Sequence, residues 1–416
     1  MSYINLNYRP SETDLICEFR IEPEKESMIR DAAEKIASES SIGTWTEIKT
    51  MKPRIKNLAA KVFEIKGNWI KVAYPIDLFE PGNMPQILSS VAGNIFGMKA
   101  VCNLRLEDIH WSYKLMKSFK GPFFGIQGVR KLIKVKDRPL TGTIVKPKLG
   151  LNEKEHARVA YEAWIGGVDI VKDDENLSNL KFNKFEKRVI ETLKMRDKAE
   201  KETGERKMYM PNVTAETNEM IRRARFVKER GGEYAMVDIL TAGWSGLQSL
   251  RNEELKLVLH AHRAGHAALT RNKKHGISML VIAGIARLIG VDQLHIGTVI
   301  GKMEGPKEEV LAIGEEIERG IIKKHGHVLS ENWRHIKPIF AVASGGLHPG
   351  LVPYLVEELG KDIIMQFGGG IHGLGTYTGA MAVRQAVEAT MQNISLKEYA
   401  KTHKELDTAL KKWCKH

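Results

Sequence analysis

The chain has 416 residues, of which 43% are hydrophobic and 28% are charged, a composition that excludes wholesale disorder and fibrous repeats. This length suits two domains, one of which could be a barrel of about 250 residues. The formal charge of +13 fits an anionic partner, such as nucleic acid, an anionic surface or a phosphorylated substrate.

The first hundred residues alternate between strand and helix patterns. Strands are predicted at 16–21, 61–66, 69–74 and 100–106, and Gly67-Asn68 forms a turn between the middle two. Apolar residues at helical spacing predict helices at 24–39 and 85–96. This order predicts a ferredoxin-like α+β domain over residues 1–125, whose boundary lies in a basic stretch with Gly and Pro at 120–139.

From residue 140 onward, short strand patterns alternate with helical ones. Strands are predicted at 142–146, 168–172, 208–212, 234–238, 257–262, 293–296, 339–343 and 363–366. Helical periodicity lies between them, for example at 153–163, 216–229 and 350–358. Eight such units predict a (β/α)8 TIM barrel over residues 126–416, with its site at the carboxyl ends of the strands. A doubly wound α/β sheet is the weaker alternative, because no GxGxxG motif follows an early strand.

Six of the predicted strands end in polar or glycine-rich residues. These endings are Lys146-Pro147-Lys148, Lys172-Asp173-Asp174-Glu175, His262-Arg263, His295, Ser344-Gly345-Gly346 and Gly368-Gly369-Gly370. Any one of them could be an ordinary solvated strand end, since polar residues are common in loops. Together on one rim of a barrel they favour a functional site.

The end of the second barrel strand points to metal chemistry. Lys172 and Asp174 face the same side of the strand, and Glu175 follows where the chain turns. Two adjacent carboxylates suit a hard cation such as Mg²⁺. From spacing alone an ion pair with the lysine is preferred, because an ammonium group cannot ligate a metal. A neutral lysine amine that adds CO₂ becomes an anionic carbamate, however, and a carbamate can join the ligands.

The last two strands end in glycines that expose backbone N–H groups at the usual phosphate corner of a TIM barrel. Structural turns are the alternative for these glycines. Arg263 and His295 could form a second anion site, with surface polarity as the alternative. Two anion sites on either side of a metal would fit a bisphosphate.

The segment 166–176, GGVDIVKDDEN, resembles the large subunit of ribulose-1,5-bisphosphate carboxylase/oxygenase (RuBisCO), most closely the archaeal form III type. Further blocks of the family lie at 143–151, 262–266 and 295–305, and the resemblance runs from 39–46 to the last barrel helix. It implies carboxylation of ribulose 1,5-bisphosphate by CO₂ and water to give two 3-phosphoglycerate. An oxygenase side reaction and a role in archaeal AMP salvage are also implied.

The resemblance also implies roles for individual residues. The implied metal ligands are Lys172 as a carbamate, Asp174 and Glu175, which bind Mg²⁺, and the carbamate is the base for enolisation. Lys146 donates the late proton to carbon, Lys148 tunes the pKa of Lys146, and His262 assists hydration and cleavage. Lys302 reaches the carboxylate derived from CO₂ and pairs with Glu39. The implied substrate-binding residues are Arg263 and His295 at one phosphate, Ser344 at the sugar backbone, and Thr44, Trp45, Gly346, Gly368 and Gly369 at the other phosphate.

The resemblance implies a shared assembly. Glu39 and Asn94 belong to the amino-terminal domain and in the family reach the barrel of a neighbouring subunit. A homodimer with shared active sites, or a higher assembly of dimers, is therefore expected, without a small subunit, nucleic acid or membrane. A cytoplasmic location is expected, because the sequence shows no signal peptide or long apolar segment and its three cysteines are scattered.

Two departures from the family pattern and two rival functions remain. The loop after Gly370 looks shorter than usual, which predicts altered phosphate binding, and the carboxyl-terminal tail that latches the mobile loop in plant-type enzymes looks absent. A RuBisCO-like enolase of methionine salvage is one rival, but such proteins usually lose several of the residues named above. A nucleic-acid-binding protein is the other, but the basic clusters are short and scattered.

Overall fold

The computed structural model describes residues 2–25, 28–300 and 307–414. The chain divides into two compact units, each described by itself. Unit 1 comprises Met1–Gly121, Gly265–Ile289 and Arg319–Ile336, and unit 2 comprises Pro122–Ala264, Gly290–Glu318 and Lys337–His416. The predicted boundary after residue 125 stays a prediction.

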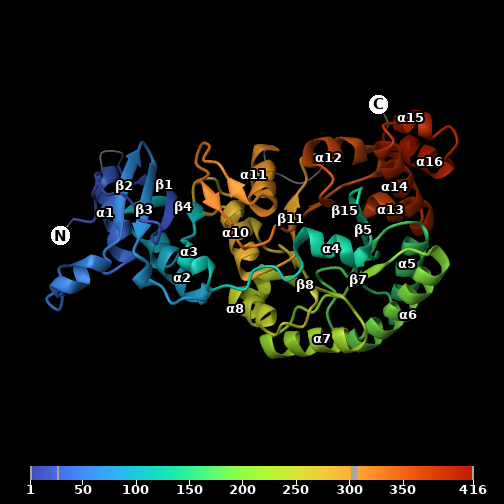
Figure 1. Cartoon of the computed structure of the whole chain (residues 1–416), viewed down its shortest axis with the longest axis horizontal. Helices are drawn as coiled ribbons and strands as arrows, with labels where there is room; N and C mark the ends of the chain where they lie inside the picture. The colour runs from blue at the N-terminus through green and yellow to red at the C-terminus, as the bar shows by residue number, and fades with distance from the viewer. Residues whose placement is uncertain (1, 26–27, 301–306, 415–416) are drawn as a thin grey trace. The chain divides into compact units, whose positions relative to one another are not determined.

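Unit 1 is built on a sheet with the strand order β10-β4-β1-β3-β2. Figure 1 labels its four long strands, β4, β1, β3 and β2. Its long strands are β1 (Leu15–Pro23), β2 (Lys61–Lys66), β3 (Trp69–Tyr74) and β4 (Val101–His110), and each of these pairs antiparallel to its long neighbours. With helices α1 (Ile29–Glu39) and α2 (Met84–Val91), this order confirms the predicted ferredoxin-like arrangement. The short strand β10 (Gly276–Ile277) adds a parallel edge beside β4 that the sequence pattern did not predict.

The second helix of unit 1 ends earlier than its periodicity predicts. α2 stops at Val91 rather than near residue 96, and the 3-10 helix η4 (Asn94–Gly97) follows. A β carbon at Gly93 would lie 2.1 Å from the Ser89 carbonyl oxygen, so the chain turns there at a residue without one. The remaining elements of unit 1 are η2 (Pro53–Leu58), η3 (Ile76–Leu78), α3 (Tyr113–Met116), α9 (Ala267–Thr270), α10 (Met279–Ile289), β12 (Ile321–Ile322) and β13 (Glu331–Asn332).

Unit 2 is the predicted TIM barrel. Its strands, in the order β7-β6-β5-β15-β14-β11-β9-β8, are all parallel to their neighbours. A bridge between Asn212 and Met236 joins the two ends of this sheet and closes the barrel. The strands are β5 (Leu140–Ile144), β6 (Ile170–Lys172), β7 (Met208–Met210), β8 (Tyr234–Asp238), β9 (Val258–His262), β11 (Gln293–Gly297), β14 (Phe340–Ser344) and β15 (Ile363–Phe367).

Helices surround the barrel strands, as Figure 1 shows for α5, α6 and α7. The helices of unit 2 are α4 (Gly125–Ile133), α5 (Glu153–Ile165), α6 (Phe185–Thr203), α7 (Thr217–Glu229), α8 (Ile239–Asn252), α11 (Lys307–Glu318), η5 (Pro349–Leu351), α12 (Val352–Leu359), α13 (Gly369–His372), α14 (Thr376–Met391), α15 (Leu396–Tyr399) and α16 (Lys404–Trp413). In the part of the chain that the structure describes, no helix has both the length and the apolar character needed to cross a membrane.

Helix α4 closes the amino-terminal end of the barrel. Its Ile126, Val129 and Ile133 pack in one core with residues at or near the starts of the strands. The strand residues of this core are Leu140, Ile170, Met208, Met210, Tyr234, Met236, Val258, Phe340, Val342 and Ile364. Burial of each such Ile or Val side chain contributes about 1.5–3 kcal/mol. Because apolar packing fills this end, the opposite rim is left for polar side chains.

A buried carboxylate also ties elements together at the amino-terminal end. Asp292 lies just before β11, and its oxygens accept hydrogen bonds from the backbone N–H groups of Phe124, Gly125 and Leu259 at 2.7, 2.8 and 3.1 Å. Its side chain is fully buried, so water cannot replace these bonds. Asp292 therefore holds both the start of α4 and strand β9 in place.

We expect Asp292→Asn to lower the free energy of unfolding of unit 2. The amide group replaces one acceptor oxygen by a donor, which leaves at least one buried N–H without an acceptor and costs about 1–3 kcal/mol. The measurement is the urea midpoint followed by circular dichroism. Asp31→Asn, at an exposed pair with Lys35, is the control and should keep the wild-type midpoint. An unchanged midpoint in Asp292→Asn would contradict this account of the barrel end.

Candidate active site

A cavity of about 610 Å³ lies at the carboxyl ends of the barrel strands. Its lining includes predicted site residues at or near the ends of β5, β6, β9, β11, β14 and β15. These are Lys146, Lys172, Glu175, His262, His295, Ser344, Gly346, Gly368 and Gly369. The structure therefore brings together side chains that are up to 223 residues apart in the sequence, from Lys146 to Gly369.

Lys172 is the deeply buried amine of the cavity, with 1% of its side chain exposed. Its Nζ donates a hydrogen bond to the Asp173 carbonyl oxygen at 2.8 Å and lies 3.2 Å from the Met236 sulfur. The nearest carboxylate oxygen, on Glu175, is 3.7 Å away. Burial lowers the pKa of Lys172 below its usual value, although Glu175 and Asp174 oppose the change. The neutral form of the amine therefore begins to form at lower pH here than on an exposed lysine.

Asp174 and Lys146 form an ion pair on the rim. Asp174 Oδ2 accepts a hydrogen bond from Lys146 Nζ at 2.7 Å, and its Oδ1 accepts from the backbone and side-chain nitrogens of Asn176, both at 3.1 Å. Burial alone would raise the pKa of Asp174, but the bonds from Lys146 and Asn176 lower it. Asp174 is thus a carboxylate with one oxygen held by a cation.

Lys172, Asp174 and Glu175 fit a divalent metal only if Lys172 supplies an anionic oxygen. Among the described residues, no three His, Cys, Asp or Glu side chains are grouped in a way that could hold a metal ion. Asp174 and Glu175 supply oxygen ligands of the kind that Mg²⁺ prefers. A third anionic oxygen would come only from Lys172, if CO₂ had added to its amine.

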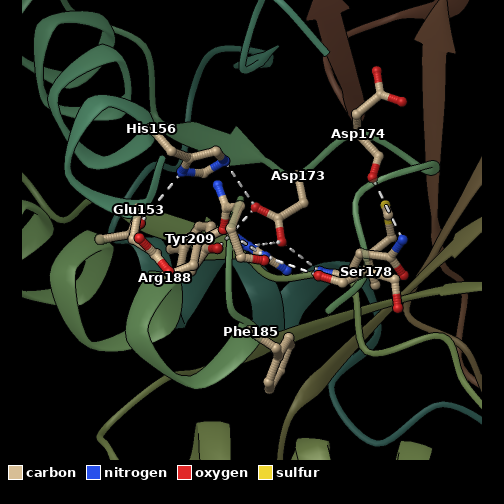
Figure 2. A network of polar contacts seen from close by, with 12 residues as sticks. Glu153, His156, Asp173, Asp174, Ser178, Phe185, Arg188 and Tyr209 are labelled. Atoms are coloured by element: carbon tan, nitrogen blue, oxygen red, sulfur yellow. Dashed lines mark hydrogen bonds and ion pairs between the residues drawn. The ribbon is translucent and has the colours of Figure 1, made fainter. Parts of the chain in front are cut away.

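Asp173, between Lys172 and Asp174, faces the opposite way. Figure 2 shows its carboxylate among side chains of the surrounding elements, while the Asp174 carboxylate points away from them. The Asp173 oxygens accept hydrogen bonds from Arg188 Nε at 3.0 Å and Tyr209 Oη at 2.8 Å, and His156 Nε2 lies 3.1 Å away. Burial alone would raise the pKa of Asp173, but Arg188 and His156 hold it well below its usual value. The buried Asp173 carboxylate thus holds the turn after β6 against α5, α6 and β7.

His262, the last residue of β9, is oriented by the carboxylate of Asp238, the last residue of the neighbouring strand β8. Its Nδ1 lies 2.9 Å from Asp238 Oδ1, and its Nε2 lies 3.8 Å from Glu175 Oε2. Because a carboxylate oxygen accepts, Nδ1 donates the proton of this hydrogen bond, and Nε2 is the nitrogen turned toward Glu175. This geometry suits proton transfer at Nε2.

His295 is paired with a second buried histidine. Its Nε2 lies 2.9 Å from Nε2 of His260, whose Nδ1 lies 2.9 Å from Gln293 Oε1. Because the Gln293 oxygen accepts, His260 Nδ1 carries the proton, and His295 Nε2 donates to His260. Burial lowers the pKa of His260 to about 3 and the pKa of His295 well below its usual value. Both rings are therefore neutral at physiological pH.

The glycine-rich ends of β14 and β15 form one corner of the cavity. Gly345 and Gly346 have φ angles of 123° and 73°, which favour glycine. A β carbon at Gly370 would lie 2.1 Å from the Leu347 carbonyl oxygen, whereas one at Gly369 would meet no atom within 4 Å. The segment after β14 and the start of α13 therefore pack backbone to backbone at Gly370, whereas Gly369 has free space beside it.

Besides the aliphatic Ile144 and Leu347, the cavity wall contains three polar or aromatic residues that were not predicted: Gln366, His348 and Trp413. Both amide atoms of Gln366 are buried without a hydrogen-bond partner among the described residues. Gln366 is the last residue of a predicted strand, so its polar side chain at that position is a sequence signal for the cavity. Trp413 comes from α16, and no sequence pattern connects that helix with the rim.

The other predicted residues lie elsewhere. Lys148 is exposed, and neither it nor Arg263 lines the cavity; burial lowers the pKa of Arg263 to about 10. Glu39, Thr44, Trp45 and Asn94 belong to unit 1, where the Trp45 side chain is 91% exposed. Lys302 lies outside the described residues. The roles of these residues stay predictions, as do those of the short loop after Gly370 and of the carboxyl-terminal tail.

Comparison with known proteins gives matches along nearly the whole chain. The family model described as "Ribulose bisphosphate carboxylase large chain, catalytic domain" matches residues 125–413, and the model of the N-terminal domain matches residues 2–115. A ribulose bisphosphate carboxylase of Methanosarcina mazei is 55% identical over 99% of both chains. One of Methanocaldococcus jannaschii is 54% identical over 99% of this chain and all of that protein.

Two solved structures resemble this one closely. The dimeric archaeal Rubisco from Hyperthermus butylicus has a TM-score of 0.94 and 47% identity, and the match covers 99% of this chain and 98% of that one. The octameric Rubisco from Pyrococcus horikoshii, solved in complex with a sulfate ion, has a TM-score of 0.92 and 48% identity over 99% and 96% of the two chains.

We expect Gly370→Ala and Gly369→Ala to differ in stability. The new methyl group in Gly370→Ala would overlap a backbone oxygen that cannot move alone, so the thermal midpoint should fall by several degrees. The same group in Gly369→Ala enters open space, so the midpoint should stay at the wild-type value. Differential scanning fluorimetry measures both. Equal midpoints for the two variants would show that the loops do not pack as described.

Proposed function

Because the chain belongs to the family of ribulose bisphosphate carboxylase large chains, we propose that it joins CO₂ and water to ribulose 1,5-bisphosphate and yields two 3-phosphoglycerate. The observation that carries this proposal is the buried Lys172 amine, with its lowered pKa, beside Asp174 and Glu175. An oxygenase side reaction and a place in archaeal AMP salvage are part of the proposal, and the name carboxylase/oxygenase of the Pyrococcus horikoshii relative supports the first of them.

The metal would be Mg²⁺, held by Asp174, Glu175 and a carbamate formed when the neutral Lys172 amine adds CO₂ and releases a proton. When bound, the metal polarises the carbonyl of the substrate and stabilises the enediolate. The burial that lowers the pKa of Lys172 favours the reactive amine. Glu175 Oε2, 3.7 Å from Nζ, lies close enough to share a ligand site with the modified lysine.

Two side chains of the cavity would move protons. Lys146 holds its ammonium group 2.7 Å from Asp174 and is the proposed donor of the final proton to carbon. His262 is held by Asp238 at 2.9 Å, so its Nε2 is the nitrogen available for proton transfer during hydration and cleavage. Lys148 would add positive charge near the metal, and Lys302 would reach the carboxylate derived from CO₂ and pair with Glu39.

The two phosphates would bind at separate places on the rim. The glycine-rich corner of Gly346, Gly368 and Gly369 offers backbone N–H groups to one phosphate. Arg263 and His295 would hold the other, and Ser344 would contact the sugar backbone. The neutral His295 donates its Nε2–H to His260, so it would donate to the phosphate only once Nδ1 also gains a proton, and the charge at that phosphate would otherwise come from Arg263.

We propose a homodimer or an assembly of dimers. The solved relatives described above are dimeric and octameric. In such an assembly Glu39, Thr44, Trp45 and Asn94 would complete the site of a neighbouring subunit. The high exposure of Trp45, a large apolar side chain, supports a partner surface there.

The proposal is tested by carboxylation itself. The protein is incubated with CO₂ and Mg²⁺, ribulose 1,5-bisphosphate is added without oxygen, and 3-phosphoglycerate is measured. We expect product from the wild type and none above background from Lys172→Ala, because that variant lacks the amine that CO₂ modifies. A folded wild type that makes no product would instead favour the RuBisCO-like enolase.

Activation should depend on pH through the Lys172 amine. Protonated amine does not react with CO₂, so the rate of activation at fixed CO₂ should fall as the pH falls through the pKa of Lys172. Because burial lowers that pKa below 10.5, this loss should occur at lower pH than for an exposed lysine. Stopped samples assayed for carboxylation give the profile. A midpoint at the usual lysine value would contradict the proposed effect of burial.

A further inference from the structure

We infer that Asn212 is a positioning residue for the metal carboxylates, although it follows a strand that contributes no ligand. This inference rests on the proposed metal site and goes beyond it. Asn212 lies two residues after β7 and is 1% exposed. Its backbone and side chain contact three consecutive residues, Asp173, Asp174 and Glu175.

The contacts of Asn212 fix the backbone of the turn that carries the carboxylates. Asn212 Nδ2 donates to the Glu175 carbonyl oxygen at 3.0 Å and lies 3.4 Å from that of Asp174. The first distance is that of a full hydrogen bond and the second that of a weak one. The backbone N–H of Asn212 donates to Asp173 Oδ2 at 3.0 Å. The side-chain amide thus holds the main chain from which both ligands project.

The same residue links this turn to the histidine side of the cavity. Asn212 Oδ1 accepts from the Thr214 N–H at 3.0 Å, and Thr214 Oγ1 accepts from the Asp238 N–H at 2.9 Å. Asp238 in turn holds His262 at 2.9 Å. A continuous chain of hydrogen bonds therefore runs along the rim from the β6 turn, across the ends of β7 and β8, to the proton-transfer histidine on β9.

A purely structural role for Asn212 would stabilise the fold without affecting the metal. A positioning role predicts more, because partners behind metal ligands set the ligand geometry and their loss typically lowers metal affinity about 10–100-fold. Asn212→Ser and Asn212→Ala separate the contacts. A serine hydroxyl can still accept from the Thr214 N–H, as in other turns of this kind, but it cannot reach the carbonyl oxygens of the β6 turn.

The experiment measures Mn²⁺ affinity by electron paramagnetic resonance at saturating CO₂, with Mn²⁺ as the probe for Mg²⁺. We expect both Asn212→Ser and Asn212→Ala to weaken Mn²⁺ binding about 10–100-fold. The Michaelis constant for ribulose 1,5-bisphosphate at saturating metal should stay near the wild-type value, because the glycine-rich corner is untouched. The thermal midpoint of each variant is recorded in parallel.

Gln385→Ala is the matched control. Gln385 is also a buried amide, 6% exposed, whose Nε2 donates to Glu405 at 2.8 Å and whose Oε1 accepts from the Leu406 N–H at 2.9 Å. Its truncation removes similar bonds beside α16, so it should lower the thermal midpoint while Mn²⁺ affinity stays unchanged.

The remaining outcomes overturn the inference in distinct ways. Wild-type affinity in both Asn212 variants would show that the contacts do not position the ligands. An equal loss in Gln385→Ala would assign the effect to stability, and a loss in Asn212→Ala alone would assign it to the Thr214 turn. Wild-type protein that binds no Mn²⁺ would overturn the metal site as well. Wild-type protein that binds Mn²⁺ but makes no 3-phosphoglycerate would overturn only the proposed carboxylase.

Discussion

The buried carboxylate of Asp173 is the interaction on which the geometry of the site depends. Removing an ion from water is costly, and this anion is tolerated because Arg188, His156 and Tyr209 approach it from α6, α5 and β7. Strand alternation then places Lys172 and Asp174 on the other side of the chain. One anion thus connects the helical layer to the reactive rim and holds the turn between two strands in place.

Burial acts in opposite directions on the neighbouring charged groups of this turn. It lowers the pKa of Lys172, which lacks a carboxylate within 3.5 Å, and so favours the neutral amine. Asp173 and Asp174 remain ionised, because each has cationic or N–H partners that outweigh burial. Lys172 differs from the two aspartates in the charged and N–H partners around it and not in how deeply it is buried. Lys172 thus has a lowered pKa next to two aspartates whose carboxyl groups keep pKa values below the usual one.

The sequence predicted the barrel, the ferredoxin-like sheet and the family, because strand periodicity, strand-end polarity and a contiguous segment around Lys172 are local signals. It did not predict which side chains of the helices and of β7 meet Asp173, or that Gln366 and Trp413 line the cavity. Those facts depend on which helix packs behind a strand and where a distant helix ends. Neither is encoded in spacing along one segment.

The position of Trp413 has a practical consequence for handling this protein. The last described helix brings its indole ring to the cavity wall, beside His348. A purification tag fused at the carboxyl end would begin four residues after that ring, on the segment that follows α16. A tag at residue 1 is attached to the other unit and leaves the end of α16 unchanged.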